Sequence, residues 1–275
     1  MPTTLADPSA ASISYSDTGG NGRPVVLIHG WPLDRRSWDS NIFALSSNGF
    51  RVIAYDRRGF GESEKTNDRY DYETLADDLR RIITELDLRN ASLVGFSMGG
   101  GEVARYVARF GEDRIHSLVF AAAVTPFMLQ TEENPQGPLT KAAASEMETA
   151  LRNDRLVFFD NFTKKFFSVD DELKVSEEQR QEAIALCQAS GIDAALACMS
   201  AFATTDFRED LKLITAPTLV IHGDGDGTVP FEGSGKRTNE IIGHSMLYLI
   251  KEGPHGINVA NSEEFNQVLV EFLQQ

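Results

Sequence analysis

The stretch Leu93-Val94-Gly95-Phe96-Ser97-Met98-Gly99-Gly100-Gly101 decides the fold of this chain. Three of the four residues at 91–94 are apolar, as in a buried strand, and those at 102–110 carry apolar side chains at helical spacing. Between them, Gly-x-Ser-x-Gly predicts a tight strand-to-helix turn that lifts the hydroxyl of Ser97 above the sheet. Its two glycines let strand and helix approach closely. A glycine-rich turn with an incidental serine is the alternative, which the flanking elements disfavour.

The composition indicates a globular protein of acidic character. Hydrophobic residues make up 41% of 275 residues, and 26 Lys and Arg against 41 Asp and Glu give a net charge of −15. This charge argues against nucleic acid or an anionic membrane as a partner. The first 14 residues lack the basic start and apolar run of a signal peptide, and no apolar stretch approaches the ~18 residues of a membrane span. We therefore expect a cytoplasmic protein with no membrane partner, and free, semi-buried thiols at Cys187 and Cys198.

Apolar runs alternate with helical patterns along most of the chain, which predicts a parallel sheet with helices on both faces. The expected strands are 11–15, 24–28, 51–55, 91–94, 116–124, 217–221 and 245–250. Between Thr125 and Leu213 the alternation stops, and we expect helices without any strand. These helices are 141–151, 155–167, 176–190 and 192–202. The sequence thus predicts an α/β core from residues 1–124 and 214–275, with a helical lid of residues 125–213 inserted over the strand ends.

A nucleophilic serine requires a base, and the base requires an orienting carboxylate. In a parallel sheet both should follow later strands, because ligands bind at the carboxyl ends of the strands. His255 lies in a glycine-flanked loop after the last predicted strand. Asp224 and Asp226 follow the strand before it. We favour Asp226, which lies farther from the strand end, and expect Asp224 to stabilise the loop; the order Ser97, Asp226, His255 suits this architecture.

The remaining histidines are expected to be structural or surface residues, because none has a partner at a matching position. They are His29, His116, His222 and His244. No pair of histidines has metal-ligand spacing. The segment from Asp224 to Asp226 departs from a calcium loop at its sixth and twelfth positions. We therefore predict no metal site.

A tetrahedral intermediate needs two hydrogen-bond donors for its oxyanion. We expect one from the backbone N–H of Met98, at a helix N-terminus where the helix dipole favours negative charge. The second is expected from the backbone N–H of Trp31, in the loop that follows the strand 24–28. Pro32 has no N–H and cannot donate. Its predicted role is to fix the loop and aim its own carbonyl.

Five ordered motifs resemble the α/β-hydrolase superfamily, and more narrowly the cofactor-free (non-haem) bacterial haloperoxidases, which group with aryl esterases and perhydrolases. The motifs are His29-Gly30-Trp31-Pro32-Leu33-Asp34, Tyr55-Asp56-Arg57-Arg58-Gly59-Phe60-Gly61, Gly95-Phe96-Ser97-Met98-Gly99, Asp224-Gly225-Asp226 and Pro254-His255-Gly256. The resemblance implies a mostly parallel eight-stranded sheet with an inserted lid. It also implies the triad and oxyanion donors named above, no cofactor, and hydrolysis of short-chain or aryl esters through an acyl-enzyme.

The resemblance further implies a reaction with hydrogen peroxide. In this group peroxide can replace water in deacylation, which releases a peracid that oxidises halide in solution. Pro32 after Trp31 is the pattern of the perhydrolase members, in which its carbonyl can accept a hydrogen bond from peroxide. Gly101 departs from the family pattern, and no functional reason for it is visible in the sequence. Members of the group often form homo-oligomers, although no residue here indicates an oligomeric state.

An apolar acyl pocket is expected from Pro32, Phe127, Phe162, Val229 and Phe231, since family pocket residues fall at these places. For any single phenylalanine, ordinary packing between lid and core is an equal alternative. Lactonase or γ-lactamase activity with the same triad stays open, and so does a weakly hydrolytic ligand receptor. A dehalogenase or epoxide hydrolase is disfavoured, because these relatives carry aspartate where this chain has Ser97.

Overall fold

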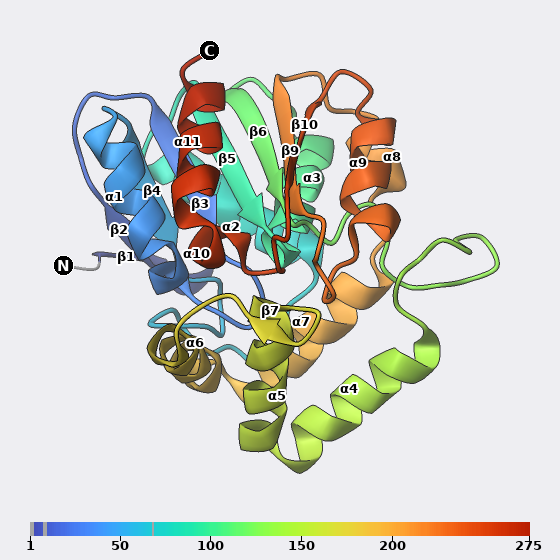
Figure 1. Cartoon of the computed structure of the whole chain (residues 1–275). Helices are drawn as coiled ribbons and strands as arrows, with labels where there is room; N and C mark the ends of the chain where they lie inside the picture. Colours follow the sequence, from blue (N-terminus) through green and yellow to red (C-terminus); the bar gives the residue numbers. More distant parts are fainter. Residues whose placement is uncertain (1–2, 8–9, 68) are drawn as a thin grey trace.

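A computed structural model (Figure 1) describes residues 3–7, 10–67 and 69–275 of the chain. Its centre is an eight-stranded sheet with the order β1-β2-β4-β3-β5-β6-β9-β10. The strands are β1 (Thr3–Asp7), β2 (Ala10–Asp17), β3 (Pro24–Ile28), β4 (Arg51–Tyr55), β5 (Ala91–Phe96), β6 (Ile115–Ala121), β9 (Thr218–Gly223) and β10 (Met246–Ile250). All neighbours from β4 to β10 in this order pair in parallel. Strand β2 pairs antiparallel with both of its neighbours, β1 and β4. The predicted mostly parallel eight-stranded sheet is therefore confirmed.

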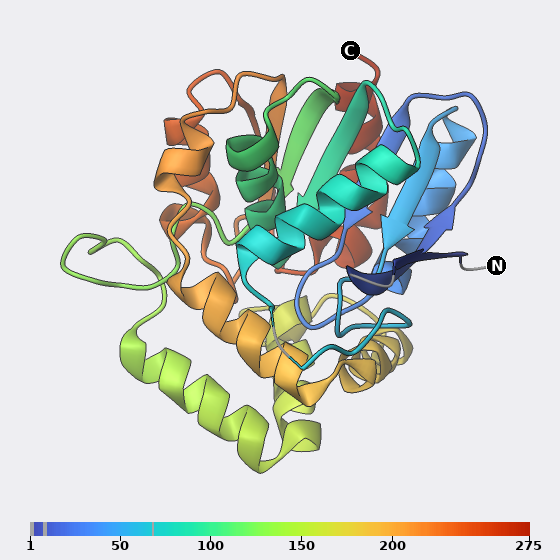
Figure 2. The same cartoon turned by 180° about the vertical axis from the view of Figure 1, so that it is seen from behind.

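Helices cover both faces of the sheet, as Figures 1 and 2 show from opposite sides. One face carries α1 (Asp39–Ser47), α10 (Ile257–Ala260) and α11 (Ser262–Leu273). The other carries α2 (Tyr72–Glu85), α3 (Met98–Phe110), α8 (Arg208–Leu211) and α9 (Gly235–Ile241). Because both faces are covered, the central strands are almost continuously apolar, and β5 is buried along its whole length.

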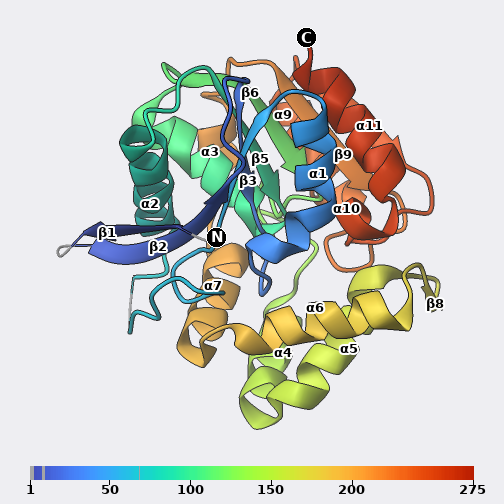
Figure 3. The same ribbon diagram turned by 90° about the vertical axis from the view of Figure 1, so that its left-hand side faces the viewer.

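Four helices are inserted between β6 and β9. They are α4 (Lys141–Asn153), α5 (Arg155–Phe167), α6 (Glu177–Ala189) and α7 (Ile192–Thr204). Figure 3 shows them gathered at one end of the sheet, beside the carboxyl ends of the strands. The inserted helices are therefore positioned to cover loops that follow β3, β5, β9 and β10.

Two strand expectations need correction. First, β1 is not among the predicted strands, because Thr3-Thr4-Leu5 lacks a clear apolar alternation; it pairs with β2 through Thr3 and Tyr15. Second, the inserted region contains a small hairpin, β7 (Ser168–Val169) with β8 (Glu172–Leu173). Its turn places Asp170 and Asp171 at positive φ. A two-residue strand is too short to leave a periodic signal in the sequence.

Helices α6 and α7 form a bent pair that buries both cysteines. Cys187 and Cys198 are free thiols and fully buried, which is deeper than the semi-buried position expected for them. Within the described part of the chain, no single helix has the length and hydropathy to cross a membrane. The pair α6 and α7 reaches those values only when both helices are counted together, and it is bent by 100°.

Candidate active site

Ser97 occupies the turn between β5 and α3, with φ 53° and ψ −118°. This positive φ is a strained conformation for a residue with a side chain, and it persists because the surrounding packing fixes it. A Cβ on Gly95 would lie 2.5 Å from the Gly99 carbonyl oxygen, and a Cβ on Gly99 would lie 2.5 Å from the Ile28 carbonyl oxygen. Both positions therefore require glycine, as the sequence pattern indicates.

The third glycine of the run has a packing explanation. A Cβ on Gly101 would lie 2.5 Å from the ring of Tyr72 and 2.6 Å from the ring of Phe207. A Cβ on Gly100 would lie 2.4 Å from the Cβ of Ala123. The first turn of α3 is thus pressed between aromatic rings and the end of the sheet, and side chains at these positions would push the helix away.

Three residues that are distant in the sequence meet at the carboxyl ends of the strands. The Nε2 atom of His255 lies 2.9 Å from the Ser97 hydroxyl oxygen, and its Nδ1 atom lies 2.7 Å from Oδ2 of Asp226. All three side chains belong to buried residues. They follow β5, β9 and β10, so the sheet itself sets their spacing.

The two candidate aspartates have different environments. Oδ1 of Asp226 accepts the backbone N–H groups of Thr228 (2.8 Å) and Val229 (2.7 Å). Burial alone would raise the pKa of Asp226, but the neighbouring histidines, led by His255, hold this pKa well below its usual range. Asp224 is exposed and accepts the backbone N–H of Glu252 at 2.5 Å, which ties the loops after β9 and β10 together.

The imidazole of His255 is held between two aromatic rings. Its centroid lies 5.2 Å from that of Phe96 and 4.9 Å from that of Phe166, the latter in an edge-on arrangement. The backbone N–H of Gly256 donates to the Phe166 carbonyl at 3.0 Å. Because Phe166 belongs to α5, an inserted helix helps to orient the histidine.

The loop after β3 passes directly beside Ser97. A Cβ on Gly30 would lie 2.8 Å from the ring of Phe96 and 3.1 Å from the Cβ of Ser97. Among the described residues, no hydrogen-bond acceptor is found for the backbone N–H of Trp31 or of Met98. These two groups flank Ser97 and can bind a ligand oxygen.

Trp31 also connects this loop to the inserted helices. Its indole N–H donates to the carbonyl of Ala195 on α7 at 2.9 Å. The indole ring contacts three phenylalanines edge-on, at centroid distances of 5.3 to 6.1 Å. These are Phe158, Phe162 and Phe202. The side chain of Trp31 is therefore fixed by α5 and α7, while its backbone lies beside Ser97.

A buried polar group supports this loop from the core. The backbone N–H of Arg57 donates to Nε2 of His29 at 3.0 Å, and Nδ1 of His29 lies 2.9 Å from the Gly30 carbonyl. The guanidinium of Arg57 donates to the His29 carbonyl and to Glu102, both at 2.6 Å. Burial and the adjacent Arg57 hold the pKa of His29 well below its usual range. His29 is thus a neutral residue that shapes the loop.

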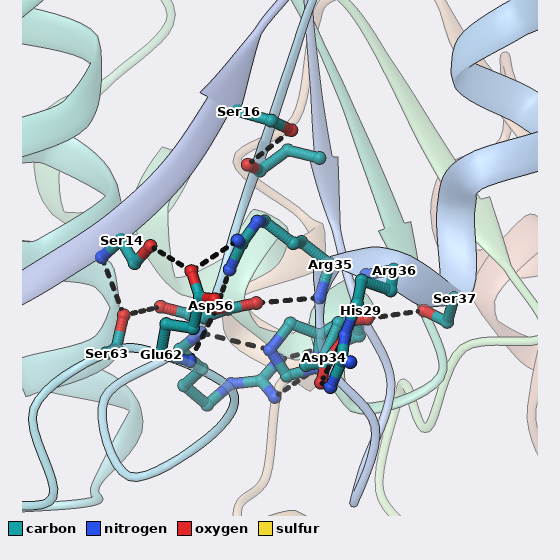
Figure 4. A network of polar contacts seen from close by, with 12 residues as sticks. Ser14, Ser16, His29, Asp34, Arg35, Arg36, Ser37, Asp56, Glu62 and Ser63 are labelled. Atoms are coloured by element: carbon teal, nitrogen blue, oxygen red, sulfur yellow. Dashed lines mark hydrogen bonds and ion pairs between the residues drawn. The ribbon is translucent and has the colours of Figure 1, made fainter. Parts of the chain in front are cut away.

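Figure 4 shows a second polar network, which joins the loops after β3 and β4. The carboxylate of Asp56 accepts the backbone N–H groups of Arg35 (2.8 Å) and Glu62 (2.9 Å) and pairs with the Arg35 guanidinium. Ser63 donates its hydroxyl to the Asp56 carbonyl at 2.6 Å. These contacts fix the loop that contains Trp31 to the body of the sheet.

A small, mostly apolar cavity adjoins the Ser97 hydroxyl. It is lined by Trp31, Ser97, Val124, Met128, Leu139, Met147, Phe162, Phe202, Thr228, Val229 and His255. Two of the predicted pocket residues, Phe162 and Val229, are in this lining. Five apolar members are not indicated by the sequence, namely Val124, Met128, Leu139, Met147 and Phe202. Met147 and Phe202 belong to helices, whose periodicity does not say which face meets the site, whereas Val124, Met128 and Leu139 lie in loops that leave no periodic pattern.

Three predicted pocket residues are not part of this lining among the described residues, and their role in binding stays a prediction. They are Pro32, Phe127 and Phe231. Phe127 is buried, and the guanidinium of Arg208 lies 5.6 Å from its ring. Phe231 packs on His222 at a centroid distance of 5.7 Å. Both phenylalanines therefore serve packing, which is the alternative interpretation of their pattern, and Pro32 is buried in the loop.

The cavity adjoins a wider groove between α4, α5 and the loop after β9. The two share Met128, Leu139, Met147, Phe162 and Thr228. The groove lining includes charged side chains. Among the described residues, the cavity lining contains no carboxylate, lysine or arginine, and its one histidine is His255. The site is thus a small apolar chamber beside a wider groove, and the groove lining includes charged side chains.

Two further observations concern titratable groups around the site. His222, for which the sequence indicates no partner there, is fully buried with Nε2 3.2 Å from Oδ2 of Asp226. Across the described ranges, no three His, Cys, Asp or Glu side chains gather as a metal site would require.

A serine on a strand-to-helix turn, followed by aspartate and histidine after later strands, defines a class of protein. The chain belongs to the alpha/beta hydrolase fold family, whose model matches residues 23–261. It is 41% identical to a non-heme chloroperoxidase of Kitasatospora aureofaciens, over 96% of each chain. It is 37% identical to a bifunctional esterase/perhydrolase of Acinetobacter calcoaceticus, over 95% of this chain and 96% of the relative.

Among solved structures, a bromoperoxidase from Bacillus anthracis matches all of both chains with a TM-score of 0.97 and 47% sequence identity. These comparisons confirm the resemblance that the five sequence motifs indicate. The chain is therefore an alpha/beta hydrolase whose relatives include haloperoxidases and an esterase/perhydrolase.

Proposed function

We propose that this protein is a serine hydrolase that acts on short-chain or aryl carboxylic esters through an acyl-enzyme. We also propose that hydrogen peroxide can take the place of water, so that the enzyme produces peracids as a cofactor-free haloperoxidase does. One observation carries the proposal: the chain of contacts from Ser97 through His255 to Asp226 opens into an apolar cavity. The haloperoxidase and esterase/perhydrolase relatives support the same chemistry.

Acylation follows from this geometry. The Ser97 oxygen attacks the ester carbonyl carbon, and its proton passes to Nε2 of His255, 2.9 Å away. The ionised Asp226 stabilises the resulting imidazolium through its contact with Nδ1. The backbone N–H groups of Trp31 and Met98 would receive the negative oxygen. His255 then returns the proton to the leaving alcohol, and the acyl group stays on Ser97.

Deacylation repeats these steps with a second nucleophile. Water, deprotonated by His255, would release the carboxylic acid; hydrogen peroxide would release the peracid by the same route. A free carboxylic acid can also acylate Ser97 with loss of water, so acid and peroxide together would give peracid. The peracid then transfers one oxygen atom to halide in solution, which yields carboxylate and hypohalous acid. No group other than the acyl chain is bound covalently.

The lining of the cavity supports a small uncharged acyl group. Its walls are aliphatic and aromatic, so a charged acyl chain would lose its hydration without gaining a partner. The adjoining groove between α4 and α5, which shares lining residues with the cavity, would take the remainder of the ester. We propose that the inserted residues 125–213 act as the lid that forms these walls.

Pro32 is the residue that we propose to favour hydrogen peroxide over water. Its carbonyl would accept a hydrogen bond from peroxide and so favour perhydrolysis over hydrolysis. The substitution Pro32→Leu is therefore expected to lower the ratio of peracid formation to ester hydrolysis. An unchanged ratio would remove Pro32 from the peroxide step.

The decisive experiment compares turnover of p-nitrophenyl acetate by the wild type and by Ser97→Ala, with no metal or cofactor added. Loss of one triad member lowers kcat by about 10⁴- to 10⁶-fold in serine hydrolases. Ser47→Ala, at an exposed serine that ends α1, is the matched control and should keep full activity. Peroxide is then added with acetate and bromide, and Ser97→Ala should lose bromination as well. Bromination that survives in Ser97→Ala would contradict the peracid route.

A further inference from the structure

His222 occupies an unusual place at the end of β9. The residue is fully buried, and its Nε2 atom lies 2.8 Å from the Val229 carbonyl oxygen and 3.2 Å from Oδ2 of Asp226. When Asp226 is ionised, both neighbouring oxygen atoms can accept hydrogen bonds but cannot donate them. Nε2 of His222 must therefore carry a proton.

The other ring nitrogen of His222 identifies its charge state. Nδ1 is buried and has no hydrogen-bond partner among the residues that the structure describes. The backbone of Gly235 lies against it so closely that an added Cβ would be 2.5 Å from Nδ1. A proton on Nδ1 would place an unpaired donor in the interior. The geometry thus selects the neutral tautomer with the proton on Nε2.

The contacts of Asp226 show what this proton does. A carboxylate can accept about four hydrogen bonds. Oδ1 receives the N–H groups of Thr228 and Val229, whereas Oδ2 receives that of His255 and lies 3.2 Å from Nε2 of His222. The turn after β9 is closed from both sides, because Val229 donates to Asp226 and accepts from His222. Rotation of the carboxylate away from His255 would break several of these contacts at once.

We infer that His222 is a positioning residue, whose shared Nε2–H locks the Asp226 carboxylate and the Val229 carbonyl in the arrangement that directs Oδ2 to His255. This inference rests on the proposed function. His222 touches neither substrate nor the reacting atoms. It acts through Asp226, by keeping the 2.7 Å contact with His255 in place when the imidazole becomes charged.

The test compares two substitutions at His222. His222→Phe removes the donor and keeps a ring, whereas His222→Gln supplies an amide N–H that can reach the same oxygens. Misplacement of a catalytic group by about 1 Å can cost about 10²-fold in rate. We therefore expect His222→Phe to lower kcat on p-nitrophenyl acetate by about 10- to 100-fold with KM nearly unchanged, and His222→Gln to restore most of it.

Controls separate positioning from folding. Rates are expressed per active site, titrated with a fluorophosphonate that labels Ser97, so that unfolded protein is not counted. His116→Phe is the matched variant, because His116 lies on β6 and contacts Arg23 at 2.8 Å, away from the site. It should keep the wild-type kcat. A His222→Phe enzyme with wild-type kcat per site, or a His222→Gln enzyme as slow as His222→Phe, would overturn the inference.

A second measurement needs neither a substitution nor turnover. In protein labelled with ¹⁵N-histidine, the imidazole shifts of His222 at pH 7.5 should show protonated Nε2 and bare Nδ1. A proton on Nδ1 would overturn the inference even if the variants fail to fold. If the wild type does not hydrolyse esters, the proposed function fails, and these spectra still decide the tautomer of His222.

Discussion

The site has two parts that are built in different ways, and they are best understood together. The proposed reacting groups Ser97, Asp226 and His255 come from short loops at strand ends, and each is fixed by several contacts within the core. The cavity walls come largely from the inserted region, through residues such as Met147, Phe162 and Phe202. In the proposed function, the core thus positions the reacting groups, and the inserted helices determine which acyl groups fit the cavity.

Trp31 is where these two parts meet. Its backbone belongs to the core loop beside Ser97, and its side chain is bound by helices α5 and α7 of the inserted region. The two parts of the site should therefore respond differently to substitution. Changes at strand ends should lower the rate for every ester, whereas changes in the inserted helices should alter which ester reacts best.

The largest expected effect is that of Asp226→Asn. The substitution removes the charge that stabilises imidazolium at His255, and in other triads it lowers kcat by about 10⁴-fold. Asp224→Asn is the matched control two residues away, where the exposed carboxylate accepts the Glu252 N–H. It should keep kcat within a few-fold. Equal losses in the two variants, measured with p-nitrophenyl acetate, would show that the loop and not the charge is what matters.

The next effect concerns selectivity. Truncation of Phe162 or Met147 to alanine enlarges the cavity beside Ser97. In an apolar pocket, one methylene group changes the ratio of kcat/KM between two substrates by about 10-fold or more. Both variants should therefore raise kcat/KM for hexanoate relative to acetate by about 10-fold. Phe162→Ala should also lower kcat, because this ring supports Trp31. Phe43→Ala, at an exposed ring on α1, is the control; the same change in ratio there would contradict the division between core and insert.

A smaller effect is expected on stability. Gly101→Ala gains about 1 kcal/mol of helix propensity. It also pushes a methyl group against Tyr72 and Phe207, and overpacking of this kind costs about 1–3 kcal/mol. We expect a net decrease in Tm, with kcat per active site little changed. Gly243→Ala, where an added Cβ would meet no atom of the described residues within 4 Å, should leave Tm unchanged. A stabilised Gly101→Ala protein would show that α3 can shift at no cost.

The smallest effect is expected from thiol reagents. Burial raises the pKa of Cys198 to about 12, because the thiolate is disfavoured in an apolar interior. At pH 8 only about one thiol in 10⁴ is then ionised. Iodoacetamide should therefore leave esterase activity intact, and mass spectrometry should find neither Cys198 nor Cys187 modified until guanidinium is added. Rapid modification of the native protein would show that α6 and α7 open readily.

Much of the core could be predicted from the sequence, because local patterns determine it. The strands Pro24–Ile28 and Arg51–Tyr55 have the bounds that their apolar runs indicate. The proximity of Ser97, Asp226 and His255 follows from their order and their places after strands, since the carboxyl ends of parallel strands meet. Strand β1 could not be predicted in this way, because the pairing of a polar edge strand depends on its neighbour and leaves little periodicity.

The walls of the site were harder to predict, for a different physical reason. Which apolar residues line the cavity depends on how α4, α5 and α7 pack over the core. Phe127 and Phe231 turn to packing contacts instead, while Leu139 and Phe202 face the cavity. The role inferred for His222 is invisible in the sequence for the same reason. Its neighbour Asp226 is four positions away, yet the turn that brings them together is fixed by tertiary contacts.

The hydrogen bond between Trp31 and Ala195 has a consequence for how the enzyme is assembled. It joins residues 164 positions apart, so it cannot form until the inserted helices have docked on the sheet. Contacts of such long sequence separation carry a high loop-closure cost and tend to form late. During synthesis, the turn at Ser97 can therefore be complete while the loop beside it is still unanchored. Competence for catalysis would arrive as one of the last steps of folding, well after the core has become compact.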